Sequence, residues 1–240
     1  MRDSPLLFTK LSGAGNDFIL LDGAKLARGA SRPALARRLC PRRTAVGADG
    51  LLVLDRRGPG GIPSADYYNA DGSRAFCANG SRCAAWWMFR RGWTGKRMSF
   101  LSCGKPVEAA VLGSRGLAAR VRLSMPPARA LKDLRVRVLG RTLRVLLVDA
   151  GVPHAVIRVS GLDSFPVEAF GRVLRRHKAF GKAGANVDFM NWDSGRLRLR
   201  TYERGVEAET LACGTGAVAA AAAAWVWSGR RSPIRVAVRS

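Results

Sequence analysis

The pattern of apolar and polar positions divides the chain into many short strands and a few helices. Residues 51–54 form a continuous β-favouring apolar run, which predicts a buried strand. Residues 196–203 alternate in polarity and predict another strand, whose inner face holds Leu197, Leu199 and, by the same period of two, Glu203. The remaining predicted elements are helices at 33–40 and 165–176, strands at 6–10, 18–21, 98–111, 117–123, 155–159 and 186–189, a glycine-containing loop at 12–17, and a hairpin at 134–148 that turns at Leu139-Gly140.

Two further helices are predicted to begin directly after a cysteine and to be apolar on every side. The run after Cys213 is almost entirely alanine and ends at Trp227, which is too short to cross a bilayer and typical of a buried helix. The helix after Cys77 ends in a basic turn and Gly92. Both cysteines are followed by a small residue, then Asn or Thr, then glycine. This repetition predicts a duplicated architecture with one thiol in each half.

The two copies predict two halves built on the same plan. We expect an N-terminal half at residues 1–118 and a C-terminal half at residues 119–232, with residues 233–240 joining the first half as its last strand. The chain is expected to cross between the halves near Met125-Pro126-Pro127. A chain of 240 residues, 48% of them hydrophobic, is long enough to bury a core of this kind.

The charge of the chain is strongly basic, with 41 Lys and Arg against 17 Asp and Glu and a formal net charge of +24. The basic residues are scattered, with no basic tail and no run longer than two. Clustering is what marks a nucleic-acid footprint, so a solvated basic surface is favoured over a specific nucleic-acid site. Salt-dependent nonspecific binding is still expected. No segment resembles a signal peptide or a membrane helix, so no membrane association is expected.

The number and spacing of the five cysteines argue against a full disulfide framework and against a zinc site. Their number is odd, and Cys77 and Cys83 have neither CxxC spacing nor a histidine cluster nearby, so zinc is not expected. A reducing cytoplasm fits this usage best. We expect Cys40, Cys83 and Cys103 to behave as small apolar residues.

A thiol at the start of a helix is chemically different from one in a core. The helix dipole is worth about 0.3–2 kcal/mol there, which lowers a thiol pKa by at most about 1.5 units and predicts some thiolate at neutral pH. Two such thiols, Cys77 and Cys213, can serve as base and acid on the two faces of an amino-acid α-carbon. Backbone N–H groups after each cysteine would stabilise the carbanion through the carboxylate, without a cofactor.

These residues resemble the diaminopimelate epimerase family, cofactor-independent two-cysteine enzymes of lysine and peptidoglycan biosynthesis. The resemblance runs in family order from Phe8 to about Val238. Its motifs are Gly15-Asn-Asp-Phe, Gly47-Ala-Asp-Gly, Asn69-Ala-Asp-Gly-Ser, Cys77-Ala-Asn-Gly-Ser-Arg-Cys, Gly151-Val-Pro-His, Asn186-Val-Asp-Phe, Glu203-Arg-Gly and Glu209-Thr-Leu-Ala-Cys-Gly-Thr-Gly.

The resemblance implies an α/β fold of two pseudo-symmetric halves, each a mixed β-sheet barrel wrapped around a central apolar helix, with an amino-acid substrate between them. It implies that Cys77 and Cys213 are the acid/base pair. His154 would lie near the site, although a satisfied buried histidine is an equal alternative, and His177 is expected to be structural. A homodimer is left open. The residues implied to bind substrate are Asn16, Ala78, Asn79, Gly214 and Thr215 at the reacting end, and Asn69, Asn186, Glu203 and Arg204 at the distal end.

Three departures from the family pattern bear on these expectations. Ala78 replaces a glycine and adds a methyl group where the backbone approaches substrate. Val152 replaces an asparagine, and the loss of a polar contact to a charged group is worth about 1.5–3 kcal/mol. Family members usually continue for a few strands beyond the equivalent of Ser240, so incomplete sheets with exposed edges are expected.

The departures keep two alternative functions open. One is a racemase or epimerase of the same fold that acts on another amino acid, which Val152 motivates. The other is a truncated, catalytically impaired homologue whose basic surface binds acidic partners or nucleic acid. The presence of both cysteines and an inward Glu203 favours the enzyme, because a binding module needs neither.

Overall fold

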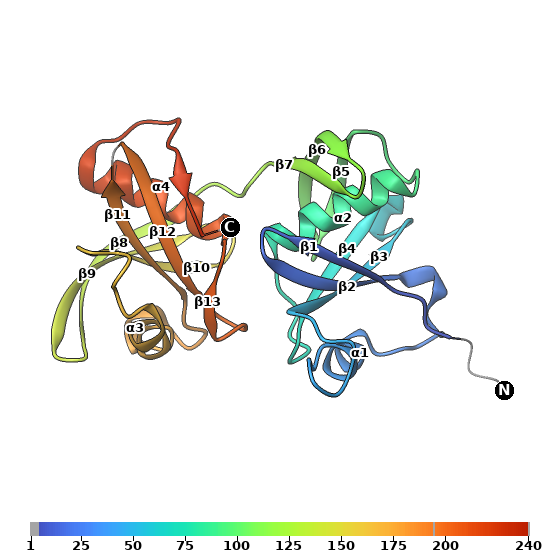
Figure 1. Cartoon of the computed structure of the whole chain (residues 1–240), viewed down its shortest axis with the longest axis horizontal. Helices are drawn as coiled ribbons and strands as arrows, with labels where there is room; N and C mark the ends of the chain where they lie inside the picture. The colour runs from blue at the N-terminus through green and yellow to red at the C-terminus, as the bar shows by residue number, and fades with distance from the viewer. Residues whose placement is uncertain (1–4, 194, 240) are drawn as a thin grey trace. The chain divides into compact units, whose positions relative to one another are not determined.

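The computed structural model describes residues 5–193 and 195–239, and the chain divides into two compact units, Met1–Ser124 and Met125–Ser240 (Figure 1). The division lies at Met125-Pro126-Pro127, where the sequence predicted that the chain crosses. Each unit is a mixed sheet with a helix on either side (Figure 1). The predicted α/β fold with two sheets is therefore confirmed.

The first unit is a sheet whose strands follow one another in sequence order. Within residues 5–124 the sheet has seven strands, of which β2–β3 and β4–β5 are parallel pairs and the other neighbours antiparallel. The strands are β1 (Thr9–Gly13), β2 (Asn16–Asp22), β3 (Gly50–Asp55), β4 (Ser64–Asn69), β5 (Arg97–Ser102), β6 (Lys105–Arg115) and β7 (Ala118–Leu123), and the helices are α1 (Arg32–Leu39) and α2 (Ala78–Arg90), with short 3₁₀ turns η1 (Gly23–Lys25) and η2 (Pro59–Gly61).

The central strands of this sheet are buried on both faces because a helix covers each face. Phe18 and Leu52 pack in the cluster around α2. Ile19 and Leu51 pack in the cluster around α1. The two-residue period of a strand sends neighbouring side chains to opposite faces, which is why residues 51–54 read as an unbroken apolar run.

The second unit repeats this plan. Its sheet runs β13-β12-β11-β10-β9-β8, with β14 paired to β12, and Figure 1 shows α3 and α4 on opposite sides of it. Ile157 and Val187 pack toward α3, whereas Val156 and Met190 pack toward α4. The elements are β8 (Arg129–Val138), β9 (Arg141–Asp149), β10 (Pro153–Arg158), α3 (Val167–Leu174), η3 (Lys178–Phe180), β11 (Asn186–Asp193), β12 (Arg196–Glu203), β13 (Ala208–Thr210), α4 (Gly214–Ser228) and β14 (Val236–Ala237).

Three hairpins share one kind of turn. In each, two residues with positive φ, between 46° and 90°, join the strands, which is the geometry that matches the strand twist. Only the third was predicted, from the strand pattern on both sides of Leu139-Gly140, because none of the three turns begins with the Asn, Asp or Gly that marks such a turn in a sequence. The three turns are Ala14-Gly15 between β1 and β2, Cys103-Gly104 between β5 and β6, and Leu139-Gly140 between β8 and β9.

These turns correct two of the predicted elements. The strand predicted at residues 6–10 begins at Thr9 and runs to Gly13, so the loop predicted at 12–17 is a two-residue turn. The strand predicted at 98–111 is two strands joined at Cys103-Gly104. The short strand β13 carried too few residues to show a period and was not predicted.

The limits of the halves also differ from those expected. Strand β7 pairs with β6 in the first sheet, so the structural division lies after Ser124 rather than after residue 118. Residues 233–240 were expected to join the first half, but Val236 and Ala237 pair with β12 of the second sheet. Ser240 lies outside the described residues.

Helix α4 is held against its sheet by small side chains. Ala219, Ala220 and Ala223 are fully buried, whereas Trp225 is 57% exposed and Val226 is 40% exposed. The expectation of burial on every side is therefore wrong at the end of the helix. No helix in residues 5–193 and 195–239 has the length and apolar character to cross a membrane.

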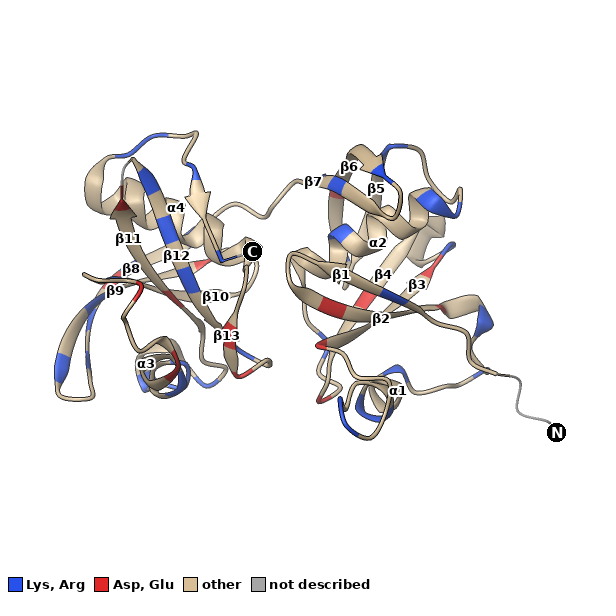
Figure 2. Cartoon of the chain, in the orientation of Figure 1, with Lys and Arg blue, Asp and Glu red and all other residues tan. Residues whose placement is uncertain are grey.

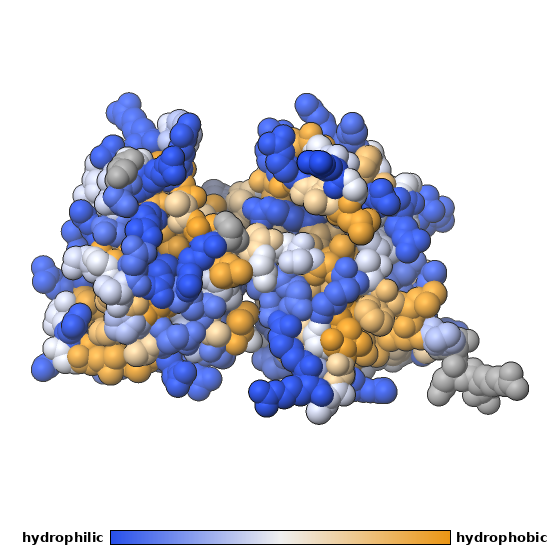
Figure 3. Space-filling model, viewed as in Figure 1, coloured by the Kyte–Doolittle hydropathy of each residue, from blue (hydrophilic) through white to orange (hydrophobic). Residues whose placement is uncertain are grey.

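The basic residues lie on strands, helices and loops of both units (Figure 2). Hydrophilic and hydrophobic residues alternate over the face shown in Figure 3. Many guanidinium groups are already paired, as Arg32 is with Asp55 and Asp66. The scattered distribution agrees with the sequence pattern, and the absence of a specific nucleic-acid site stays a prediction.

The close packing of the α4 alanines against the sheet can be tested by inserting a larger side chain. Replacement Ala223→Leu inserts side-chain volume into a fully buried contact and should lower the free energy of unfolding by about 1–3 kcal/mol. The matched control is Ala221→Leu, at a half-buried position of the same helix, where Leu and Ala have similar helix propensity. Denaturant unfolding followed by circular dichroism measures both. Equal losses in the two variants would contradict this packing.

Candidate functional site

Cys77 and Cys213 occupy the same position in matched turns at the starts of α2 and α4. Each is the N-cap residue, with φ −129° and ψ 113° at Cys77 and φ −120° and ψ 113° at Cys213. Each sulfur accepts a hydrogen bond from the backbone N–H three residues later, at 3.3 Å from Gly80 and 3.4 Å from Gly216. The matched sequences therefore fold into matched local structures, with each thiol at a helix N-terminus.

Gly216 is required by a close approach to the sheet. A Cβ atom placed there would lie 2.5 Å from Oδ1 of Asp188 and 3.2 Å from Oγ1 of Thr201. The first turn of α4 therefore lies directly over a carboxylate that the sheet provides. A favourable dipole interaction follows, because the N-terminus of a helix attracts negative charge.

In the first unit, a chain of hydrogen bonds fixes two of the predicted substrate-binding residues beside the Cys77 turn. Arg82 donates to Oδ1 of Asn79 at 2.8 Å, and Nδ2 of Asn79 donates to Oδ1 of Asn16 at 2.8 Å. Nδ2 of Asn16 then donates to Oδ2 of Asp49 at 3.0 Å. Because each amide nitrogen faces an acceptor, the orientation of both asparagines is determined.

Asp49 is itself held by a surface ion-pair cluster. Arg42 bonds Oδ1 of Asp17 and Oδ1 of Asp49 at 2.6 Å each, and Lys10 contacts Asp17 at 2.8 Å. Burial raises the pKa of Asp17, but hydrogen bonds from Arg42 and Lys10 outweigh burial and hold that pKa well below its usual value of 3.8. The cluster therefore fixes Asp49, the carboxylate at the end of the hydrogen-bond chain to Asn16.

Asn69 lies at the same end of the first sheet and is linked to this chain through Tyr67, whose hydroxyl also lies 3.4 Å from the backbone carbonyl of Asp49. Its register partner is Gly50, which in turn pairs with Phe18 next to the Asn16 turn. Oδ1 of Asn69 accepts from the Tyr67 hydroxyl at 2.9 Å, and Nδ2 donates to Ser73 at 2.9 Å. The structure brings Asn16 and Asn79 into contact and places Asn69 nearby on β4.

In the second unit, a buried polar chain leads from Cys213 into the sheet. Sγ of Cys213 lies 3.4 Å from Oγ1 of Thr215, and that hydroxyl lies 2.8 Å from Nε2 of His154. Nδ1 of His154 lies 2.6 Å from Oδ2 of Asp188. Both His154 and Asp188 are 0% exposed. His154 is thus a satisfied buried histidine and also a neighbour of the thiol turn, so the two interpretations of it are compatible.

The remaining second-unit candidates surround this chain. Oδ1 of Asn186 accepts from the backbone N–H of Arg204 at 2.8 Å, and Nδ2 of Asn186 lies 3.3 Å from Nε2 of His154. Glu203 accepts from the hydroxyl of Thr210. The guanidinium of Arg204 bonds the carbonyl of Ala183 at 3.4 Å, and burial lowers its pKa. The predicted residues Asn186, His154 and Thr215 are therefore in contact.

The residues that departed from the family pattern lie at the turns. Ala78 is 6% exposed in the first turn of α2, and Gly214 is half-buried at the equivalent place in α4. Val152 is half-buried, and its carbonyl accepts from Ala150 in the turn before β10. His177 caps η3 through a bond from the N–H of Ala179, which fits the structural role expected of it.

Burial raises the pKa of Cys213 although the thiol lies at a helix N-terminus. Desolvation raises the pKa of Cys213 well above its usual value, as do Glu203 and Asp188, and its hydrogen bonds with Thr215 and Gly216 only partly oppose this. The expectation that the helix start leaves some thiolate at neutral pH is therefore wrong for Cys213. Burial also raises the pKa of Cys40 to about 11 and that of Cys83 to about 12, as expected of apolar core cysteines.

Sequence reasoning missed the residues that support the predicted ones. Asp49 and Arg82 orient Asn16 and Asn79, and Asp188 and Thr201 lie behind His154. One signal was available for Asp188, since a carboxylate between Val187 and Phe189 on a buried strand must have a partner. Nothing in the periodicity indicated which partner it would be.

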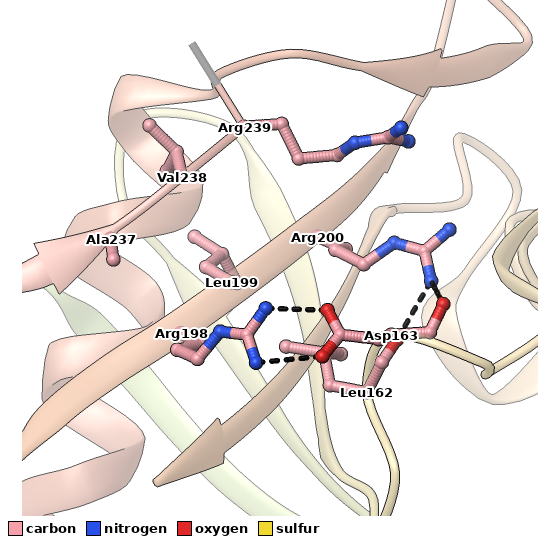
Figure 4. Close-up of a pocket in the computed structure, with 8 residues that line it drawn as sticks. All are labelled: Leu162, Asp163, Arg198, Leu199, Arg200, Ala237, Val238 and Arg239. Atoms are coloured by element: carbon pink, nitrogen blue, oxygen red, sulfur yellow. Dashed lines mark hydrogen bonds and ion pairs between the residues drawn. The ribbon is translucent and has the colours of Figure 1, made fainter. Parts of the chain in front are cut away.

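A separate pocket of about 160 Å³ lies over β12 and β14 (Figure 4). Figure 4 shows Arg198 in a fork-like pair with Asp163, and Arg200 bonded to the carbonyls of Leu162 and Asp163. Arg200 and Arg239 also share the carboxylate of Glu209. Because these guanidinium groups already have anionic or carbonyl partners, we assign no ligand to this pocket.

Comparisons with known proteins identify relatives over nearly the whole chain. The family profile described as Diaminopimelate epimerase matches residues 146–240. A diaminopimelate epimerase from Hydrogenobaculum is 39% identical, over 89% of this chain and 80% of that protein. A diaminopimelate epimerase from Aquifex aeolicus is 37% identical, over 97% of this chain and 86% of that protein.

Solved structures of lower sequence identity share the fold. A hydroxyproline epimerase from Agrobacterium vitis has a TM-score of 0.66 at 17% identity, over 97% of this chain and 80% of that chain. A phenazine biosynthesis protein of the PhzF family from Bacillus anthracis has a TM-score of 0.68 at 11% identity, over 95% and 81%. These likenesses concern the fold alone.

The Arg42 cluster predicts an acid-dependent loss of stability. Because the folded pKa of Asp17 is depressed, its stabilisation is fully present above its ordinary pKa of 3.8 and is lost progressively as the pH falls from there through the lower folded pKa. Arg42→Gln should therefore lower the free energy of unfolding at pH 7 by up to about 1 kcal/mol, a small value because Arg42 is 57% exposed. The difference from the native protein should shrink below pH 4.

Denaturant unfolding between pH 3 and pH 7 tests this, with Arg43→Gln as the control. Arg43 is the exposed neighbour of Arg42 and carries the same charge. A loss of stability in Arg42→Gln that is independent of pH, or an equal loss in Arg43→Gln, would contradict the role given to the cluster.

Proposed function

This chain belongs to the diaminopimelate epimerase family, and on that premise we propose that Cys77 and Cys213 are its acid/base pair. The enzyme is an isomerase that epimerises LL-2,6-diaminopimelate to the meso isomer in lysine biosynthesis. The proposal concerns which residues transfer the α-proton. The observation that carries it is the matched N-cap geometry of the two thiols.

The proposed reaction needs two thiols in opposite protonation states. A thiolate removes the α-proton and becomes a thiol, while the carbon is left as a carbanion. The other thiol then donates its proton to the opposite face and becomes the thiolate. Because burial raises the pKa of Cys213, the proposal makes Cys213 the acid in the first turnover, which leaves the role of base to Cys77. The proposal requires that both thiols reach the same carbon from opposite sides.

The carbanion requires stabilisation, because an amino-acid α-proton is far less acidic than a thiol. The first-turn N–H groups of a helix have no acceptor within the helix and favour an anion. In the proposal, the turns at Ala78–Asn79 and Gly214–Thr215 direct such groups toward the α-carboxylate, and Asn16 adds a fixed amide. Preorganised donors of this kind are worth about 2.7–4 kcal/mol each in acyl-transfer enzymes. No cofactor enters the proposed reaction.

The distal end of diaminopimelate carries an ammonium and a carboxylate, and the proposed site offers groups for both. Arg204 has N–H donors in a fork that suits a carboxylate, and Glu203 supplies a negative charge for the ammonium. Asn69 and Asn186 add amides that are already oriented by Tyr67 and Ser73 and by the backbone of Arg204. We propose that these four residues select the distal end.

A mechanism that relies on thiols also has a redox requirement. Because both sulfurs must be reduced to exchange protons, we propose that the enzyme works in a reducing cytoplasm. The five cysteines are recorded as thiols, which is the state that this mechanism uses. Association into a homodimer stays a prediction.

Proton NMR in D₂O tests the assignment of the two thiols. With LL-diaminopimelate and reduced native protein, the α-proton signal should disappear and the meso isomer should form. Cys77→Ala and Cys213→Ala should each reduce formation of the meso isomer by at least about 10²-fold, because each removes a group that transfers a proton.

Cys40→Ala is the matched control, since Cys40 is a buried cysteine of the core cluster around α1. Its activity should stay close to that of the native protein. Native-like formation of the meso isomer in either the Cys77 or the Cys213 variant would refute the two-thiol assignment. A Cys40 variant that is folded but inactive would do the same.

A further inference from the structure

The hydrogen-bond chain behind Cys213 has a direction that can be assigned from its fixed end. Oδ1 of Asn186 accepts from the backbone N–H of Arg204, an atom that can only donate. The Nδ2 group of Asn186 therefore faces Nε2 of His154, at 3.3 Å. Since an amide nitrogen is only a donor, Nε2 must be the acceptor and carries no proton.

The contact at Nδ1, on the other side of the His154 ring, leads independently to the same tautomer. Nδ1 of His154 lies 2.6 Å from Oδ2 of Asp188, and a carboxylate oxygen accepts. Both side chains are fully buried, so water is not an alternative partner. His154 is therefore neutral, with its single proton on Nδ1 and directed at Asp188.

The direction of the remaining bonds follows from this tautomer. With Nε2 as an acceptor, the hydroxyl of Thr215 donates to it across 2.8 Å. The oxygen of Thr215 can then only accept from Cys213, so the thiol proton points along the chain across 3.4 Å. The order of donation is Cys213 to Thr215, Thr215 to His154, and His154 to Asp188.

Asp188 is held firmly enough to impose this order. Its other oxygen, Oδ1, accepts from the hydroxyl of Thr201 at 2.7 Å. The same oxygen lies under the first turn of α4, where Gly216 leaves room for it and the helix dipole favours its negative charge. Both carboxylate oxygens thus have fixed partners. The lone pair on Nε2 of His154 is shared between the hydroxyl of Thr215 at 2.8 Å and the more distant amide of Asn186 at 3.3 Å.

We propose that Asp188 is a positioning residue of the reaction proposed above, which holds His154 in the Nδ1–H tautomer so that Nε2 can receive the proton of Cys213 through Thr215. In this step the S–H bond breaks and its proton passes to the oxygen of Thr215. The hydroxyl proton of Thr215 passes to Nε2 at the same time. The products are a thiolate and an imidazolium, whose charge the Asp188 carboxylate balances. This supplies the thiolate that Cys213 needs when it acts as the base.

The tautomer can be measured on the folded protein without substrate. The chain has two histidines, His154 and His177, so a His177→Asn protein labelled with ¹⁵N in the ring contains one histidine signal set. Asparagine is a good N-cap residue and should preserve the cap that His177 provides to η3. Long-range ¹H–¹⁵N spectra should show a protonated Nδ1 and an unprotonated Nε2. A protonated Nε2 at neutral pH would overturn the proposal.

The variant Asp188→Asn tests what the carboxylate does for the reaction. An amide nitrogen in place of Oδ2 would donate to Nδ1 and move the ring proton to Nε2, where it blocks the relay. By analogy with the Asp→Asn change in the Ser-His-Asp triad, which leaves geometry intact but selects the wrong tautomer, kcat should fall by about 10²–10⁴-fold. KM for diaminopimelate should change by less than about threefold, because Asp188 does not touch substrate in this proposal.

The matched control is Asp163→Asn, which removes an exposed carboxylate of the same unit that pairs with Arg198. It should leave the tautomer and kcat unchanged. An Asp188→Asn protein that keeps the Nδ1–H tautomer and the native kcat would overturn the proposal. A loss of kcat with no change of tautomer would also overturn it, because that result indicates a purely structural role for Asp188. If the Asp188→Asn protein does not fold, the tautomer of His154 measured in the His177→Asn protein tests the proposal by itself. The tautomer measurement also stands apart from the proposed function, whose failure would appear as an inactive native enzyme.

Discussion

The structure depends on bringing the start of a core helix against the polar end of a sheet without leaving a buried polar group unsatisfied. A helix start carries backbone N–H groups without internal acceptors, and burying them is costly unless side chains or a ligand compensate. Each core helix meets this condition in the same way, with a cysteine sulfur at the N-cap. The glycine three residues later allows the turn to approach, and at Gly216 no larger residue fits above Asp188.

The two helix starts are alike in geometry but differ in what supports them. Behind Cys77, two amides link Arg82 to Asp49, so the supporting groups are fixed donors and acceptors that do not transfer protons. Behind Cys213, a hydroxyl, an imidazole and a carboxylate form a buried chain that can pass a proton. If the two thiols exchange the roles of acid and base as proposed, such asymmetry helps, because one of them must start protonated and still be able to lose its proton.

The rest of each unit holds these starts in place. A sheet covered by a helix on each face is buried on both sides, so its central strands fix the positions of the candidate residues at their ends. Asn16, Asn69, Asn186 and Glu203 all lie at strand ends rather than within loops. The chain spans 80–86% of the two relatives named above.

The sequence by itself determined the duplicated plan, most of the strands and helices, and the cysteines that begin the core helices, because these follow from local periodicity and from motifs that repeat in order. It also indicated that Glu203 shares a face with Leu197 and Leu199, since a strand has a period of two. The hairpin turns at Ala14-Gly15 and Cys103-Gly104 were not determined, because φ is set there by strand twist rather than by residue type. Only the tertiary structure decided that Asp188 supports His154, and that burial outweighs the helix dipole at Cys213. Both depend on groups that are far apart in sequence and meet only after the sheet and the helix have packed together.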